Sequence, residues 1–169
     1  MEREPAAGDR ASFGPSLNDV YDMPGHLLRR MQQIAVSTFH DAVGDAGHGI
    51  TPVQYACLRA VAAYPGEDQV RLAGVIAYDK TTIGGVIDRL IQKGFLKRTI
   101  SEKDRRARVV HLTDTGRDLL DRITPLVTQA QNQMLSGLSE QEHRDFMRLL
   151  AKAAITANDL SRAPLRPID

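Results

Sequence analysis

The sequence predicts a mainly α-helical protein with a small β-wing. Most of the chain repeats apolar residues at three- and four-residue steps, which is the period of an amphipathic helix. After Gly94 the period changes to two over 95–100 and 107–112, as in a pair of β-strands. With 169 residues, of which 42% are hydrophobic, the chain is long enough to bury a substantial core as one domain.

Four helices are expected before the strands, at 24–43, 52–63, 69–77 and 79–93. The second begins with a capping box, because Thr51 precedes it and Gln54 stands three residues after Thr51. Pro52 suits the first turn of that helix, where no N–H is needed for a helical hydrogen bond. Asp79 is the expected N-cap of the fourth helix, and Gly94 is expected to end it.

Two long helices are expected after the strands, at 113–135 and 139–160. Thr113 is the expected N-cap of the first, and Ser139 with Glu142 forms a capping box for the second. Pro125 lies inside the first of these helices. It is expected to bend or locally unwind the helix, because proline cannot donate the helical hydrogen bond.

Both termini differ from the helical body. Residues 1–20 and 161–169 lack apolar periodicity, which predicts a flexible arm and a non-helical tail. The chain has no apolar run near 18 residues and no secretory signal at its start, so we expect a cytoplasmic protein that does not enter a membrane. The single cysteine, Cys57, excludes an internal disulfide and a cysteine-built zinc site.

The positive charge of this nearly neutral chain is concentrated in one region. The formal net charge is +1, yet residues 71–108 hold ten Lys/Arg against four Asp/Glu, a local charge of +6. The loop 101–108 is the densest part, with six charged residues in eight positions. A basic patch on a neutral protein is typical of a surface that meets a polyanion. The alternative is a charged face that only water contacts.

The order of elements, two short helices followed by a basic hairpin, is that of a winged helix-turn-helix. In this plan the second helix enters the DNA major groove, and the hairpin reaches the backbone or the minor groove. The candidate DNA-contacting residues of the helix at 79–93 lie opposite its apolar stripe: Lys80, Thr81, Thr82, Gly85 and Arg89. Internal glycines cost a helix about 1 kcal/mol relative to alanine. We assign Gly84 to packing against a neighbouring helix and Gly85 to close approach in the groove.

The segment 88–120 resembles the MarR family of bacterial regulators. The signature of the family, Asp-x-Arg followed by Leu-Thr-x-x-Gly, is present at 104–106 and 112–116. Further matches are Asp88-Arg89-Leu90, Lys93-Gly94 and Arg98. The resemblance covers roughly residues 22–160.

The resemblance implies a homodimeric repressor that binds a palindromic operator in double-stranded DNA. Its dimerisation region would comprise 22–46 and 113–160, and its DNA-binding lobe would comprise 51–112. Two half-sites are expected about 10 base pairs apart. In the wing, Asp104 would pair with Arg106, and an arginine at the tip, Arg105 or Arg106, would enter the minor groove, where narrow geometry enhances the negative potential. Lys103 would add charge at the same tip.

The resemblance also implies a small-molecule effector between the dimerisation region and the DNA-binding lobe. The candidate residues are His26, Arg30, Gln33, Tyr55 and Tyr64. A guanidinium suits a carboxylate, and a histidine can bind a ring hydroxyl or ring nitrogen. The stretch 24–33 resembles the first helix of members that control aromatic-acid breakdown, so a nicotinate-type or hydroxybenzoate-type carboxylate is expected. Alternatively, His26 and Arg30 are solvated or bridge the dimer.

Other classes of function have weaker support in the sequence. The five histidines form no H-E-x-x-H pair, and no G-x-S-x-G, phosphate-loop or dinucleotide motif is present, so no enzyme, cofactor or metal site is expected. Two alternatives remain with the same fold. One is a redox-sensing regulator that uses Cys57, which would need an electropositive and partly exposed thiol. The other is a winged-helix module that binds protein without DNA.

Overall fold

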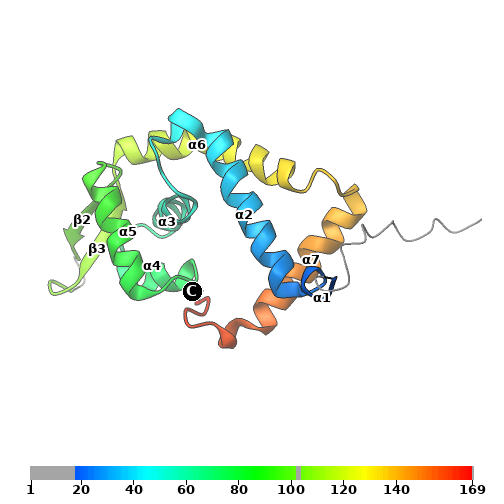
Figure 1. The fold of residues 1–169 in the computed structure, drawn as a ribbon. Helices are drawn as coiled ribbons and strands as arrows, with labels where there is room; N and C mark the ends of the chain where they lie inside the picture. The colour runs from blue at the N-terminus through cyan, green and yellow to red at the C-terminus, as the bar shows by residue number, and fades with distance from the viewer. Residues whose placement is uncertain (1–17, 102–103, 169) are drawn as a thin grey trace, which may run out of the picture.

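The computed structural model describes residues 18–101 and 104–168 (Figure 1). Its helices are α1 (Asn18–Tyr21), α2 (Pro24–Val43), α3 (Pro52–Ala63), α4 (Gln69–Val75), α5 (Lys80–Gln92), α6 (Asp114–Met134) and α7 (Glu140–Thr156). Two short 3-10 helices are η1 (Gly44–Gly47) and η2 (Asn158–Leu160). The strands are β1 (Glu67–Asp68), β2 (Leu96–Ile100) and β3 (Arg108–Leu112). The mainly helical fold with a small β-wing is therefore confirmed.

The three strands form one antiparallel sheet in the order β1-β3-β2. Strands β2 and β3 pair over five residues, from Leu96 opposite Leu112 to Ile100 opposite Arg108. We call these two strands and the turn between them the wing. Strand β1 was not predicted; it pairs Glu67 with Val110 and places the start of α4 beside the wing.

Several predicted boundaries changed in the structure. Helix α4 ends at Val75 because the chain turns at Ala77, whose φ is +51° and whose N–H bonds back to the Gly74 carbonyl. The last predicted helix is divided into α7 and η2. Helix α6 stays helical through Pro125, so the expected local unwinding is wrong. The arm predicted at 1–20 is wrong at its end, because residues 18–20 belong to helix α1, and residues 1–17 lie outside the described residues.

The hydrophobic core joins α3, α4 and α5 to the wing and to α6. Each element contributes an apolar stripe, and the largest fully buried side chains include Leu58, Leu72, Ile83, Ile87, Leu90, Leu96, Leu119 and Ile123. Burying one such side chain stabilises the fold by about 1.5–3 kcal/mol. The apolar stripe of α5 lies in this core, which leaves its opposite face free for contact with another molecule.

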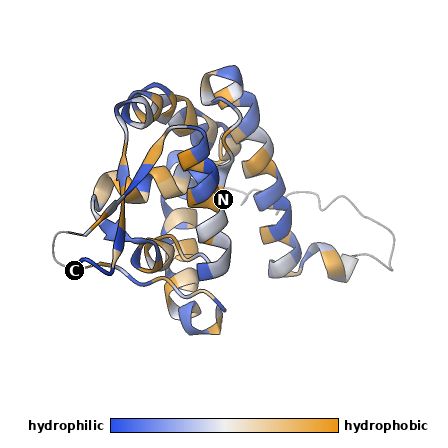
Figure 2. Cartoon of the chain, turned by 90° about the vertical axis from the view of Figure 1, so that its left-hand side faces the viewer, coloured by the Kyte–Doolittle hydropathy of each residue, from blue (hydrophilic) through white to orange (hydrophobic). Residues whose placement is uncertain are grey.

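The long helices α2 and α6 each bury one end in this core and extend beyond it. Helix α2 packs against α6, whereas α7 has no buried residue. Exposed apolar side chains on α2 and α7 include Leu27, Leu28, Ile34, Met147, Leu149 and Ile155. Figure 2 shows hydrophobic and hydrophilic residues alternating around the helices. Among the described residues, no helix is both long and apolar enough to span a membrane.

Candidate nucleic-acid interface

Helix α5 begins with a side-chain cap that binds the N–H groups of its first turn. Asp79 accepts hydrogen bonds at Oδ1 from the backbone N–H groups of Thr81 (2.8 Å) and Thr82 (3.2 Å). These bonds, from Thr82 and then Thr81, lower the pKa of Asp79 because they favour its charged form. The carboxylate therefore fixes the helix start, while the Thr81 and Thr82 side chains stay exposed.

The predicted contact face of α5 is exposed as a whole. Ile83, Val86, Ile87 and Leu90 are buried on one side of the helix. The candidate residues on the other side are all exposed: Lys80, Thr81, Thr82, Gly85 and Arg89. The assignment of Gly84 to packing is wrong, because a Cβ built there would meet no atom within 4 Å. The same open space surrounds Gly85, as expected for a surface that another molecule could approach.

The wing turn is held by backbone hydrogen bonds. The N–H of Ser101 donates to the Ala107 carbonyl (3.0 Å), and the N–H of Ala107 donates to the Asp104 carbonyl (2.9 Å). Asp104 Oδ1 accepts from the backbone N–H of Arg106 at 2.9 Å. The expected pairing of Asp104 with Arg106 is therefore made through the backbone, and the described ion pairs do not include the Arg106 guanidinium. Arg105 and Arg106 are exposed, and Lys103 lies outside the described residues.

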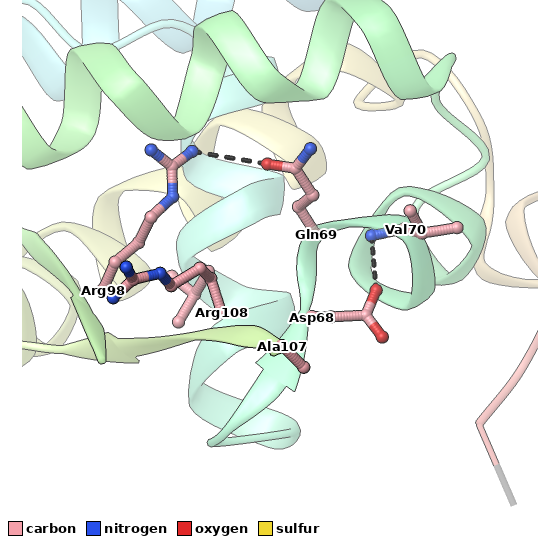
Figure 3. Close-up of a pocket in the computed structure, with 7 residues that line it drawn as sticks. Asp68, Gln69, Val70, Arg98, Ala107 and Arg108 are labelled. Carbon is pink, nitrogen blue, oxygen red and sulfur yellow. Dashed lines mark hydrogen bonds between the residues drawn. The ribbon is translucent and has the colours of Figure 1, made fainter. Parts of the chain in front are cut away.

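An ion pair connects the wing to α5. Arg98 Nη1 on β2 lies 2.6 Å from Asp88 Oδ1 on α5, and Arg98 Nη2 donates to Gln69 Oε1 at 3.4 Å. Figure 3 shows Arg98 reaching Gln69 at the start of α4. The Arg98 side chain therefore contacts both α4 and α5.

A hollow of about 680 Å³ lies between the wing and α4 (Figure 3). It is lined by Asp68, Gln69, Val70, Arg98, Ala107, Arg108 and Val110.

The Leu-Thr-x-x-Gly motif joins the wing to α6. The Thr113 hydroxyl donates to the Gly94 carbonyl (2.6 Å) and accepts from the N–H of Gly116 (3.0 Å). The Thr113 N–H donates to the Phe95 carbonyl at 3.1 Å. A Cβ at Gly116 would overlap with that same carbonyl oxygen. The motif therefore has a structural explanation, since only glycine lets the first turn of α6 approach Phe95 this closely.

The candidate effector residues on α2 each contact different side chains or are exposed. The ring of His26 contacts that of Tyr21 edge-on, with centroids 5.3 Å apart, and its Nε2 is buried with no hydrogen-bond partner in the described structure. Gln33 accepts a hydrogen bond from Arg29 (2.9 Å), and Arg30 is exposed.

The two tyrosines of the effector set lie on or next to α3. Tyr64 is the half-buried C-cap of α3. The Tyr55 hydroxyl lies 3.4 Å from Thr124 Oγ1 on α6, and its ring is 6.0 Å from that of Phe39 on α2. Tyr55 thus contacts both long helices. Sequence reasoning did not identify its partner Thr124, because no periodic signal pairs residues so distant in the chain.

Cys57 does not have the surroundings of a reactive thiol. Its side chain is fully buried in the core, and burial raises its pKa to about 12. A thiol that stays protonated at neutral pH is a poor nucleophile toward peroxide, because the thiolate is the reactive form. These surroundings oppose the redox-sensing alternative.

Comparisons with known proteins agree with this geometry. The MarR family model matches residues 50–107. The chain is 30% identical over 134 residues to the HTH-type transcriptional repressor NicR of Pseudomonas putida, which covers 79% of this chain and 84% of NicR.

Two solved structures share the fold. PcaV from Streptomyces coelicolor, in complex with its natural ligand, matches with a TM-score of 0.75 and 31% identity over 82% of this chain and 96% of PcaV. Bordetella bronchiseptica BpsR, whose DNA binding is regulated by 6-hydroxynicotinic acid, matches with a TM-score of 0.74 and 29% identity over 85% of this chain and 98% of BpsR. The family model, the sequence identity and the shared fold lead to one assignment: the chain belongs to the MarR family of DNA-binding transcriptional regulators.

Proposed function

We propose that this protein is a homodimeric repressor of the bacterial cytoplasm that binds a palindromic operator and is released by a small aromatic carboxylate. The observation that carries the proposal is the Arg98–Asp88 ion pair, which holds a basic wing next to the exposed face of α5. Helix α5 would enter the major groove, and the wing would bring its arginines to the neighbouring minor groove. Both elements belong to one DNA-binding lobe.

The exposed face of α5 has the chemistry that DNA requires. The first turn carries Lys80, Thr81 and Thr82, whose ammonium and hydroxyl groups suit phosphate oxygens. Gly85 allows close approach because it has no side chain. Arg89 can donate two hydrogen bonds to guanine or to a phosphate.

The wing would supply the second contact. Asp104 holds the turn through the Arg106 N–H, which leaves the Arg105 and Arg106 side chains exposed at the tip. An arginine in the minor groove gains from the negative potential there. Lys103, at the same tip in the sequence, is part of this proposal.

Dimerisation would cover the apolar residues that a single copy leaves exposed. Leu27 and Leu28 on α2, and Leu149 and Ile155 on α7, are about half exposed or more. Helix α7 has no buried residue of its own, so a second copy of the chain is the proposed source of its packing. A two-fold dimer of this kind matches a palindromic operator.

The proposed effector is a nicotinate-type or hydroxybenzoate-type acid. PcaV binds a natural ligand, and 6-hydroxynicotinic acid regulates the DNA binding of BpsR. In this chain His26 offers a buried Nε2 with no hydrogen-bond partner among the described residues, and Arg30 offers an exposed guanidinium. Gln33, Tyr55 and Tyr64 complete the proposed set. The acid would release DNA only by binding the non-operator conformation more tightly.

A binding titration tests the proposal. The protein is titrated into labelled DNA from the region upstream of its own gene, and fluorescence anisotropy is measured with and without nicotinate, 6-hydroxynicotinate and 4-hydroxybenzoate. Binding as a dimer and release by at least one acid are expected. Absence of specific DNA binding would favour the protein-interaction module, and binding that no aromatic acid relieves would refute the effector class.

A further inference from the structure

The segment after α7 returns to the DNA-binding lobe. We call residues 158–168 the C-terminal strap. In Figure 1 the C-terminal end lies beside α4, although α7 extends well away from that helix. The contact is specific, because the N–H of Arg166 donates to the Gly74 carbonyl at 2.8 Å. The same carbonyl accepts the Ala77 N–H, so the strap adds a second hydrogen bond at the end of α4.

The strap has a defined shape of its own. The Asn158 side chain pairs with the backbone of Leu165 in both directions: its Oδ1 accepts the Leu165 N–H at 2.7 Å, and its Nδ2 donates to the Leu165 carbonyl at 3.3 Å. Ser161 Oγ accepts the N–H of Ala163 at 3.1 Å. These bonds close residues 158–165 into a loop and aim the following residue at α4.

The fit between the strap and α4 depends on Gly74. A Cβ built at Gly74 would lie 3.0 Å from Arg166 Cβ and 3.4 Å from the Arg166 carbonyl oxygen. A larger residue would have to push the strap away. The approach is therefore close packing of two backbones.

The strap brings two arginines to the start of α5. Beside this contact lies a hollow of about 360 Å³, which the strap, α4 and the start of α5 line together: Val70, Ala73, Gly74, Tyr78, Asp79, Lys80, Arg162, Ala163, Pro164 and Arg166. Three of these residues are cations, and the one carboxylate, Asp79, already accepts two backbone N–H groups. Arg162 and Arg166 are exposed, and neither forms an ion pair with a described residue.

We propose that the C-terminal strap is a third DNA-contacting element, in which Arg162 and Arg166 bind backbone phosphates next to the start of α5. The proposal rests on the proposed operator binding. Guanidinium groups suit phosphate oxygens, to which they can donate two hydrogen bonds. DNA is the favoured partner because Lys80 belongs both to this cationic cluster and to the exposed face of α5, so the two surfaces are continuous.

The test compares Arg162→Gln/Arg166→Gln with the wild-type chain over a range of salt concentrations. This variant keeps the backbone bond from residue 166 to Gly74, so the strap can still dock. Operator affinity should fall about tenfold at low salt, because the variant cannot form the charge-assisted hydrogen bonds. The slope of log K against log salt should become shallower by about 0.9 for each phosphate that the variant no longer binds.

Two matched variants test whether the location of the strap arginines, or only their charge, determines DNA binding. Arg59→Gln/Arg122→Gln removes the same charge from exposed sites on α3 and α6, and it should leave the salt slope unchanged. Arg162→Lys/Arg166→Lys keeps the charge and should recover most of the slope. Equal slopes for wild type and the strap glutamine variant, or an equal effect of the control pair, would overturn the proposal. Failure of the wild-type chain to bind any operator would instead refute the proposed function.

Discussion

Arg98 and Asp88 lie 2.6 Å apart and join the wing to α5 across ten residues of sequence. Arg98 is the less exposed partner, at 33% against 55% for Asp88. An ion pair this exposed contributes little to stability, about 0–1 kcal/mol. The pair links the wing directly to the face of α5, so we expect its loss to appear in DNA binding.

Breaking this pair should affect binding more than folding. Arg98→Gln and Asp88→Asn should each change the free energy of unfolding by less than about 1 kcal/mol, yet each should weaken operator binding. A double-mutant cycle measured by fluorescence anisotropy and thermal unfolding checks this. If the two substitutions are additive in operator affinity, the pair does not orient the wing.

Arg106→Ala should weaken operator binding and lower its salt dependence. The Asp104 carboxylate holds the backbone of this residue, so truncating the side chain leaves the turn intact. A salt titration of DNA affinity measures the effect, with Arg122→Ala on α6 as an exposed control. Unchanged affinity for Arg106→Ala at every salt concentration would exclude this wing arginine from the interface.

Two glycine substitutions should act in opposite directions. Gly116→Ala places a Cβ on the Phe95 carbonyl oxygen and should destabilise the fold by about 1–3 kcal/mol. Gly84→Ala meets open space within α5 and should stabilise the fold by about 1 kcal/mol. Chemical denaturation measures the free energy of unfolding of both variants and tests these two signs. A neutral Gly116→Ala would mean that the junction between the wing and α6 can relax.

The cap of α5 should make stability depend on pH. The folded pKa of Asp79 is lowered from 3.8, so its stabilising effect is present above that value and is lost as the pH falls through the lower folded pKa. Asp79→Ala should reduce the melting temperature at pH 7, and the difference from wild type should shrink in acid. Asp79→Asn keeps a good cap without the titration. A difference for Asp79→Ala that is constant with pH would contradict this.

Cys57 should be inert toward oxidants. Because burial raises the pKa of its thiol to about 12, the thiolate population at neutral pH is negligible. Operator binding should be the same before and after peroxide treatment, and labelling by a thiol reagent should require unfolding. Rapid labelling of the native protein would restore the redox-sensing alternative.

Local signals in the sequence predicted much of the fold. The capping boxes at Thr51 and Ser139 and the caps at Asp79 and Thr113 are present in the structure, because each depends on residues within one helical turn. The exposed face of α5 followed from its helical period in the same way. Such features need no knowledge of distant contacts.

Features that depend on tertiary contact were missed. Strand β1 has two residues, too few to show an alternating pattern. The docking of Arg166 on Gly74 joins segments far apart in the chain, and the prolines of the tail indicated only the absence of helix. The packing role given to Gly84 was wrong because helical period alone does not show which neighbours are present.

The Thr113 hydroxyl connects the start of the wing to the start of α6. It bonds to Gly94, which precedes the wing, and to Gly116, in the first turn of α6. No flexible linker separates β3 from α6, since one ends at Leu112 and the other begins at Asp114. We therefore expect any tilt of α6 to be transmitted to the wing, with a displacement that grows along the hairpin.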